Sequence, residues 1–320
     1  MATLAARIGL GISLLAAPLV AQAYPTRAIT FVVPYPAGGR TDLTARVVAQ
    51  SLKAELGQPV VVINRPGASG VLGAKEVAGA NPDGYTFGVF STGFLATQYT
   101  VQTPTNVKDY DLVALVNMDP AAVAVSAQKG WKTLEELVDY GRSNPRKLRV
   151  GTNPGSSAHI FAAAFAKAAA LDVVYIPYRG GGERTTALAG GHIDVDFDIV
   201  APLKPMADAG KVRILAVESD RPVTLYKHIP TMREHGVDLV ITSWHGIFAP
   251  KGTPAPAIAA MNTALEKASG NPQFVEQMGK ILLGVRYMNQ QDFTRFFAQE
   301  DAVFKALIQR LGLSLAPGAR

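Results

Sequence analysis

The 320-residue sequence contains no cysteine, which excludes disulfide bonds, thiolate metal sites and a cysteine nucleophile. It also has no basic run and no basic–aromatic stripe, so we expect no nucleic-acid binding. The 31 Lys and Arg residues exceed the 25 Asp and Glu residues and are spread along the chain. Such an excess mildly favours anionic partners. With 48% apolar and 18% charged residues, the composition is that of a folded protein without low-complexity segments or internal repeats.

The N-terminal stretch MATLAARIGLGISLLAAPLVAQAYP has the pattern of a signal peptide. It has one cation, Arg7, then an apolar stretch over residues 8–20 and the small-residue motif Ala21-Gln22-Ala23. A membrane-spanning helix needs roughly 20 apolar residues, more than this stretch provides. We therefore predict cleavage after Ala23 and export.

Apolar runs of strand length alternate with segments of helical periodicity from residue 28 onward. The expected strands are 28–33, 59–63, 86–90, 122–126, 148–151, 173–176, 193–199 and 214–217. The expected helices are 41–56, 70–78, 133–143, 158–169, 184–189, 256–269, 272–278 and 290–310. This alternation predicts an α/β fold with parallel strands and helices on both faces of the sheets.

The pattern divides into two α/β domains, with a break near residues 120–125 and a return near residue 245. We assign residues 1–23 to the signal peptide, 24–122 with 246–320 to domain 1, and 123–245 to domain 2. Because the chain crosses between the domains twice, we expect a hinge of two strands.

Four strand-to-helix joints share a composition rich in Gly, Ser and Thr: PYPAGGRTD (34–42), STGFLA (91–96), NPGSSAH (153–159) and YRGGGER (178–184). Each joint taken alone is more typical of a turn with a helix N-cap. In open α/β sheets, however, ligands lie at such joints, where helix N-termini offer free N–H groups to an anion. Glycine has no Cβ to block that approach. Four joints of this kind indicate an anion-binding cleft.

Nucleotide and enzyme motifs are missing from these joints. There is no Walker loop, and the glycines of residues 67–73 have the wrong spacing for a dinucleotide fingerprint. Neither G-x-S-x-G nor H-E-x-x-H occurs. Ser157 and His159 leave open an exported hydrolase, although His159 also suits the polar start of a helix. A binding protein without a cofactor is the simplest interpretation, so we expect no enzyme.

The segment HIDVDFD places His192, Asp194, Asp196 and Asp198 on one face of a strand, because side chains alternate. Carboxylates of this kind suit Ca²⁺ or Mg²⁺. Spread along a strand, however, they span too far to bind one ion. We therefore expect no metal site, with Asp194 and Asp196 at a solvated strand start and only Asp198 reaching the cleft.

The chain resembles the tripartite tricarboxylate transporter receptors, or Bug family of periplasmic solute-binding proteins. The resemblance rests on ordered motifs that include YPTRAITFVVPYPAGGRTD, LGQPVVVINRPGASGVLGAKEVAGANPDGYT, IPYRGGG, DVDFD and TSWHGIFAPKGTP. It implies a type II periplasmic binding protein fold, with two Rossmann-like domains joined by a two-strand hinge. Its motif positions imply these ligand-binding residues: Tyr35, Pro36, Ala37, Gly38, Gly39, Thr41, Asp42, Ser91, Thr92, Ser156, Ser157, His159, Tyr178, Gly180, Gly181 and Asp198.

The resemblance further implies a small carboxylate or dicarboxylate as ligand and a membrane permease as partner. We expect a monomer; a receptor serving signalling instead of uptake is an alternative. The chain departs from the family pattern at Glu183 and Asp196, either of which could select an amino-bearing ligand. Arg40 could favour a second carboxylate. The alternative is that these side chains simply face water.

Overall fold

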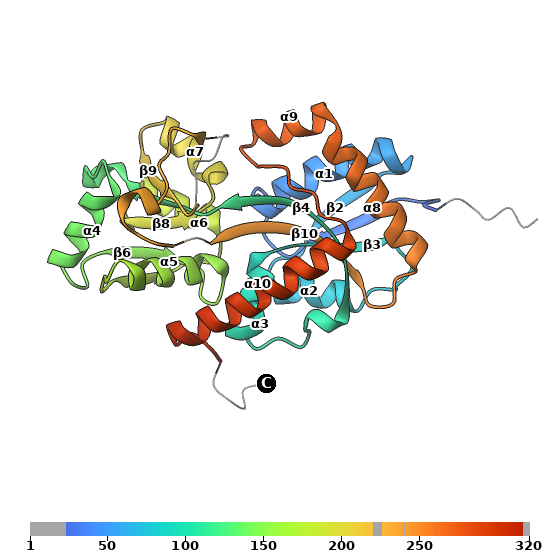
Figure 1. Ribbon diagram of the computed structural model, residues 1–320, viewed down its shortest axis with the longest axis horizontal. Helices are drawn as coiled ribbons and strands as arrows, with labels where there is room; N and C mark the ends of the chain where they lie inside the picture. Colours follow the sequence, from blue (N-terminus) through green and yellow to red (C-terminus); the bar gives the residue numbers. More distant parts are fainter. Residues whose placement is uncertain (1–23, 220–225, 240, 316–320) are drawn as a thin grey trace, which may run out of the picture.

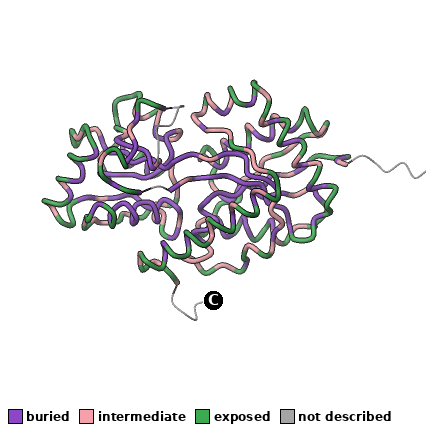
Figure 2. The backbone as a smooth tube through the Cα atoms, viewed as in Figure 1, coloured by how far each residue is buried: buried purple, intermediate pink, exposed green. Residues whose placement is uncertain are grey.

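The computed structural model describes residues 24–219, 226–239 and 241–315. The predicted signal peptide and its cleavage site lie outside the described residues. Figure 1 shows two lobes, each built on a five-stranded sheet with helices packed around it. Strands fill the purple, buried interior of both lobes in Figure 2, and exposed helical faces surround them. The predicted α/β fold of two domains is therefore confirmed.

Domain 1 contains the first sheet, in the order β2-β1-β3-β10-β4. Its strands are β1 (Ile29–Val33), β2 (Val60–Asn64), β3 (Thr86–Ser91), β4 (Tyr110–Pro120) and β10 (Thr242–Pro250). Its helices are α1 (Arg40–Leu56), α2 (Val71–Ala78), α3 (Thr92–Thr100), α8 (Ala255–Gly270), α9 (Pro272–Lys280) and α10 (Gln290–Leu311).

Domain 2 contains the second sheet, in the order β7-β6-β8-β5-β9. Its strands are β5 (Ala122–Ser126), β6 (Arg149–Thr152), β7 (Val174–Pro177), β8 (Val195–Asp198) and β9 (Val212–Val217). Its helices are α4 (Leu134–Ser143), α5 (Ser157–Ala168), α6 (Gly181–Ala189) and α7 (Val200–Asp208). Short 3₁₀ turns lie at Ala68–Gly70, Val107–Asp109, Ala127–Lys129 and Arg233–His235. The exact limits of the domains stay a prediction.

The expectation of parallel strands is only partly right. β1 is parallel to β2 and β3, and β6 is parallel to β7 and β8. By contrast, β10 is antiparallel to β3 and β4, and β5 is antiparallel to β8 and β9. The difference arises because the chain changes sheets here, and a crossing strand enters its new sheet without a helical crossover. β4, β10, α3 and α7 were not among the predicted elements.

β4 and β10 pair along their whole length and run between the two lobes in Figure 1. β4 passes into β5 through Ala121, so one continuous stretch of chain belongs to both sheets. This antiparallel pair is the predicted two-strand hinge.

Helix α10 packs against both domains. One hydrophobic cluster joins Phe248 and Phe293 of domain 1 to Phe161 and Phe197 of domain 2. At the same side, Thr100 Oγ1 donates a hydrogen bond to the Gly155 carbonyl at 2.7 Å. The two lobes are therefore in direct contact beside the hinge, which brings their loops face to face.

Candidate functional site

Four helices of the described chain begin at loops near the contact between the two domains, where the sequence predicts the cleft. The N-caps of α1, α5, α6 and α7 are Gly39, Ser156, Gly180 and Ile199, and none of them caps its helix with a side-chain hydrogen bond. Each helix follows the carboxyl end of a strand. The junctions before α1, α5 and α6 are three of the predicted joints, whereas the junction before α7 was not predicted. At the fourth predicted joint, residues 91–96, Ser91 Oγ caps α3 by accepting from Gly93 N. Free N–H groups and the positive ends of several helix dipoles therefore gather in one place.

Arg40 connects these helix N-termini across the cleft. It is the first residue of α1, and its Nη2 donates a hydrogen bond to Ser157 Oγ of domain 2 at 3.0 Å. Its Nη1 lies 3.7 Å from Asp198 Oδ1, at the end of β8. In the adjoining loop, a Cβ on Gly181 would lie 2.8 Å from Asp198 Oδ2, and a Cβ on Gly180 would lie 3.8 Å from Pro36. Arg40 is thus a cation at the meeting point of both domains.

Asp42 holds the first glycine loop in place. Its carboxylate accepts hydrogen bonds from Gly38 N at 2.9 Å, Arg46 Nε at 3.0 Å and Asn64 Nδ2 at 2.9 Å. Burial favours a higher pKa for Asp42, but these hydrogen bonds outweigh it and lower the pKa. Gly38 has φ +80°, a conformation that favours glycine, whereas Gly39 is extended. Asp42 is therefore a buried support behind the loop and Gly38 forms its turn, while Pro36 and Ala37 are exposed.

Tyr35 and Ser91 are brought together on the domain 1 side. Ser91 Oγ donates to Tyr35 Oη at 3.3 Å and accepts from Gly93 N at 3.2 Å. A Cβ on Gly93 would lie only 2.7 Å from Tyr35 Oη, so glycine is needed for this close approach. Burial raises the pKa of Tyr35, which keeps the phenol protonated as a donor.

Two of the predicted site residues in domain 1 support the hinge strand β10. Thr92 Oγ1 accepts a hydrogen bond from Trp244 N at 2.9 Å, and Thr41 Oγ1 lies 3.1 Å from His245 Nε2. Both threonines are buried. Their hydroxyls fix the position of β10 relative to the cleft loops.

Ser157 and His159 do not form the pair that a hydrolase would need. Ser157 Oγ accepts from Arg40, whereas His159 Nδ1 accepts from Gly155 N at 3.3 Å and its ring packs against Tyr175. Burial lowers the pKa of His159. Ser156 Oγ donates to the Asn153 carbonyl at 2.8 Å. The segment therefore shapes the start of α5, and it meets domain 1 through the Ser157 hydroxyl and the carbonyls of Pro154 and Gly155.

Arg184 is the residue that organises the cleft side of domain 2. Its Nε donates to Asp196 at 2.7 Å and its Nη2 to Asp198 at 3.0 Å. It also donates to Asn153 Oδ1, whose amide group in turn donates to the Tyr178 carbonyl. The Arg184 side chain is 3% exposed and that of Asp196 is 0% exposed, so this is a buried ionic network.

The contacts of these acidic residues contradict one expectation and bear on the two alternatives left open for Glu183 and Asp196. Asp194 and Asp196 are buried and not solvated: Asp194 binds Arg149 and Lys129, and Asp196 binds Arg184. Asp196 therefore does not face a ligand. Glu183 is ion-paired with Arg179 of the adjoining loop at 2.8 Å and does not point at Arg40 or Asp198. Within the part of the chain that the structure describes, no three His, Cys, Asp or Glu side chains are grouped to hold a metal ion.

The predicted residue Tyr178 lies half-buried against the hydrophobic cluster of α6, α7 and β9. Its backbone N–H donates to the Thr152 carbonyl at 2.8 Å, which pins the start of the loop. Its side chain has no contact with Arg40 or Asp198 among the described hydrogen bonds. The structure thus places the Tyr178 side chain against the apolar cluster of domain 2.

A second set of polar residues escaped the sequence prediction because it lies in the unpredicted strands β4 and β10. His245 Nδ1 is 2.7 Å from Asn117 Oδ1, and Asn117 Nδ2 donates to Asp119 at 2.7 Å. Asp119 also accepts from Gly284 N at 2.8 Å. Burial raises the pKa of Asp119 to about 7, although these bonds and the charge of Arg40 oppose the rise. The chain of contacts leads from Thr41 in the cleft helix into the hinge.

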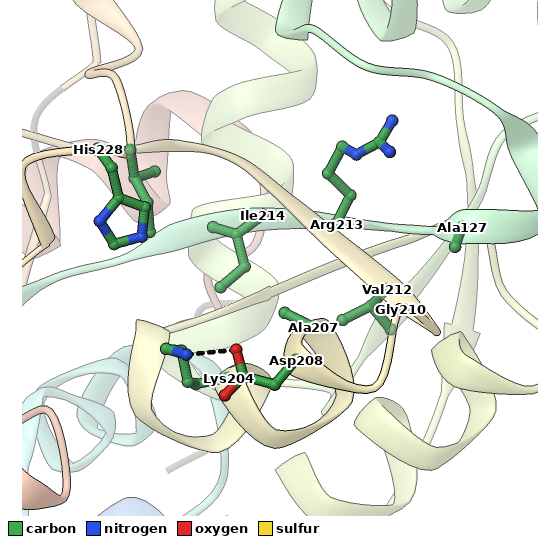
Figure 3. Close-up of a pocket in the computed structure, with 10 residues that line it drawn as sticks. Ala127, Lys204, Ala207, Asp208, Gly210, Val212, Arg213, Ile214 and His228 are labelled. Atoms are coloured by element: carbon green, nitrogen blue, oxygen red, sulfur yellow. Dashed lines mark hydrogen bonds and ion pairs between the residues drawn. The ribbon is translucent and has the colours of Figure 1, made fainter.

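A pocket of domain 2 lies apart from this site (Figure 3). It is lined by α7 and β9 with His228, and it contains the ion pair of Lys204 with Asp208. None of the predicted ligand-binding residues lines it.

In the described residues, no helix is both long and apolar enough to cross a membrane.

Comparison with known proteins shows the family to which the chain belongs. Residues 44–313 match the tripartite tricarboxylate transporter family receptor. The chain belongs to this family. One such relative, the UPF0065 protein in gbd 5'region of Cupriavidus necator, is 34% identical over 315 residues, which are 98% of this chain and 96% of the relative.

Solved structures of similar sequence have the same fold. The periplasmic binding protein BugD is 29% identical with a TM-score of 0.85, over 91% of this chain and 99% of BugD. Rpa4515 of R. palustris, solved with adipate, is 29% identical with a TM-score of 0.87, over 91% of this chain and 99% of its own. The predicted Bug-family resemblance and type II periplasmic binding protein fold are confirmed, and relatives of this kind are solute-binding proteins.

Proposed function

We propose that the protein is an exported periplasmic receptor that captures a small carboxylate between its two domains and delivers it to a membrane permease. The observation that carries the proposal is the gathering of four uncapped helix N-termini around Arg40 and Ser157. Unpaired N–H groups, a hydroxyl and a guanidinium are the donors that a carboxylate accepts. The adipate in the related Rpa4515 structure supports this ligand class.

Binding would favour the arrangement in which the domains touch, because the ligand contacts both of them. In the structure, Arg40 of α1 already reaches Ser157 of domain 2. A carboxylate held between these residues adds interactions that exist only when the domains are together, so it shifts the population toward that state. The permease would then bind the closed, ligand-loaded form of the receptor.

A thermal-shift screen with mono-, di- and tricarboxylates, amino acids and aromatic acids tests the proposal. A true ligand stabilises the native state by RT ln(1 + [L]/Kd), without any turnover. We expect a rise in Tm with at least one carboxylate and none with uncharged amides of the same size. Turnover of an ester or amide that is lost in Ser157→Ala would contradict the receptor function.

A further inference from the structure

We propose that Arg40 and Asp198 together select carboxylates that carry a hydrogen-bond donor, ammonium or hydroxyl, on the carbon next to the carboxylate. This inference rests on the proposed function, because it concerns the same cleft. It assigns to Asp198 the role of ligand selection. Glu183 and Asp196 cannot have this role, because they are ion-paired with Arg179 and Arg184.

Arg40 has a binding capacity that its protein contacts do not fill. Nη2 donates to Ser157 Oγ, but Nη1 is 3.7 Å from Asp198 Oδ1, too far for a hydrogen bond. The side chain is 15% exposed, so it lines the cleft without being buried in either domain. A planar guanidinium with a free N–H edge suits a carboxylate, which accepts two parallel hydrogen bonds.

Asp198 has acceptor capacity on the same side of the cleft. Oδ2 accepts from Arg184 and Oδ1 accepts from Ile199 N at 2.9 Å. A carboxylate offers about four acceptor positions, so roughly two remain. The side chain is 10% exposed, and Oδ1 is the atom nearest to Arg40. A donor group placed there would meet an oxygen that is ready to accept.

The balance of charge explains why an unsubstituted carboxylate would bind less well. Domain 2 supplies one buried cation, Arg184, for the two carboxyls of Asp196 and Asp198. Arg40 supplies the second cation when the domains meet. A ligand carboxylate that takes over Arg40 leaves Asp198 facing a new negative charge. A donor on the adjoining carbon removes that conflict, and specificity follows from the penalty on ligands that lack it.

Isothermal titration of the mature protein with three matched sets of acids tests this selection. The sets are propionate, lactate and alanine; succinate, malate and aspartate; and glutarate, 2-hydroxyglutarate and glutamate. Within each set, only the group on the carbon next to the carboxylate changes. In the set whose length fits the cleft, we expect the hydroxyl or ammonium member to bind roughly tenfold more tightly, or better, than the unsubstituted acid.

Variants assign the preference to the two side chains. Asp198→Asn should reduce the advantage of the ammonium member to about threefold or less, because the charge that pairs with it is gone. Arg40→Gln should weaken every member of the set, and Arg40→Lys should weaken them less. Glu183→Gln is the matched control and should leave all affinities unchanged. Should Asp198→Asn not fold, the wild-type ratios and the Arg40 variants decide the question.

The outcomes separate this inference from the proposed function. Equal binding of all members of the fitting set overturns the inference and leaves the receptor function intact. So does binding of benzoate alone, tested beside the nine acids. If none of these carboxylates binds, both the inference and the proposed function fail.

Discussion

Each domain has buried carboxyl groups behind a glycine loop at the contact between the domains. The groups that neutralise these carboxyls differ between the two domains. In domain 1, Asp42 is held by two neutral N–H donors, from Gly38 and Asn64, and by Arg46, whose side chain is half-exposed. In domain 2, Asp196 and Asp198 share the fully buried Arg184. Asp42 keeps two of its three donors when one of them is removed. Removal of Arg184, by contrast, leaves both Asp196 and Asp198 without their cation.

This difference predicts that Arg184→Met has the largest effect on stability. It leaves two buried carboxyls without their cation, so the free energy of unfolding should fall by about 3–5 kcal/mol. Urea denaturation of the ligand-free protein measures the loss. Arg149→Met is the matched control, because Lys129 still pairs with Asp194 and Arg149 is more exposed. Equal losses in the two variants would show that burial of Arg184 does not matter.

The hinge offers a third case, in which a proton neutralises the carboxyl. With a pKa of about 7, folded Asp119 keeps a proton that the unfolded chain releases above about pH 4. The free energy of unfolding contributed by Asp119 should therefore fall, by a few kcal/mol, as the pH rises from about 4 to about 7. The difference between wild type and Asp119→Asn, measured by urea denaturation across this range, should show the fall. A difference that does not change with pH would contradict the assignment.

Asp42→Asn should have an intermediate effect. The amide cannot accept all three hydrogen bonds of the carboxylate, so we expect a loss of about 1–3 kcal/mol in the free energy of unfolding. We also expect weaker ligand binding, because the 34–39 loop loses its anchor. Arg46→Gln should cost at most about 1 kcal/mol, because Arg46 is half-exposed and Gly38 N and Asn64 Nδ2 still donate to Asp42. A larger loss in Arg46→Gln than in Asp42→Asn would reverse the proposed hierarchy.

The smallest effect is expected at the glycines of the domain 1 loop. Gly38 has φ +80° and open space around it, so Gly38→Ala should cost about 1 kcal/mol through backbone conformation alone. Gly39 is extended, so Gly39→Ala should cost less. In domain 2, Gly181→Ala should instead perturb ligand binding, because its Cβ would press on Asp198. Chemical denaturation and titration with the best ligand compare the three variants.

Most of the elements flanking the cleft could be predicted from the sequence, because local patterns define them. Helix α1 follows a glycine turn and ends at Gly57, whose φ of 66° is typical of a helix C-terminus. The joints at residues 34–42, 153–159 and 178–184 lie at carboxyl ends of strands, as their order predicted. The missed strands β4 and β10 lie where the chain crosses between the sheets, outside the strand–helix–strand alternation that predicted the other strands.

The sequence by itself determined the two α/β domains, the glycine loops and the family, since these depend on local periodicity and on motif order. Only the tertiary structure decided which charged residues meet. Asp194, Asp196 and Asp198 alternate along one strand, yet the first binds Arg149 and the other two share Arg184. Arg40 reaches Asp198 although 158 positions separate them in the chain. Ion pairs form between side chains that folding brings within a few ångströms, and that proximity is set by how the sheets and helices pack.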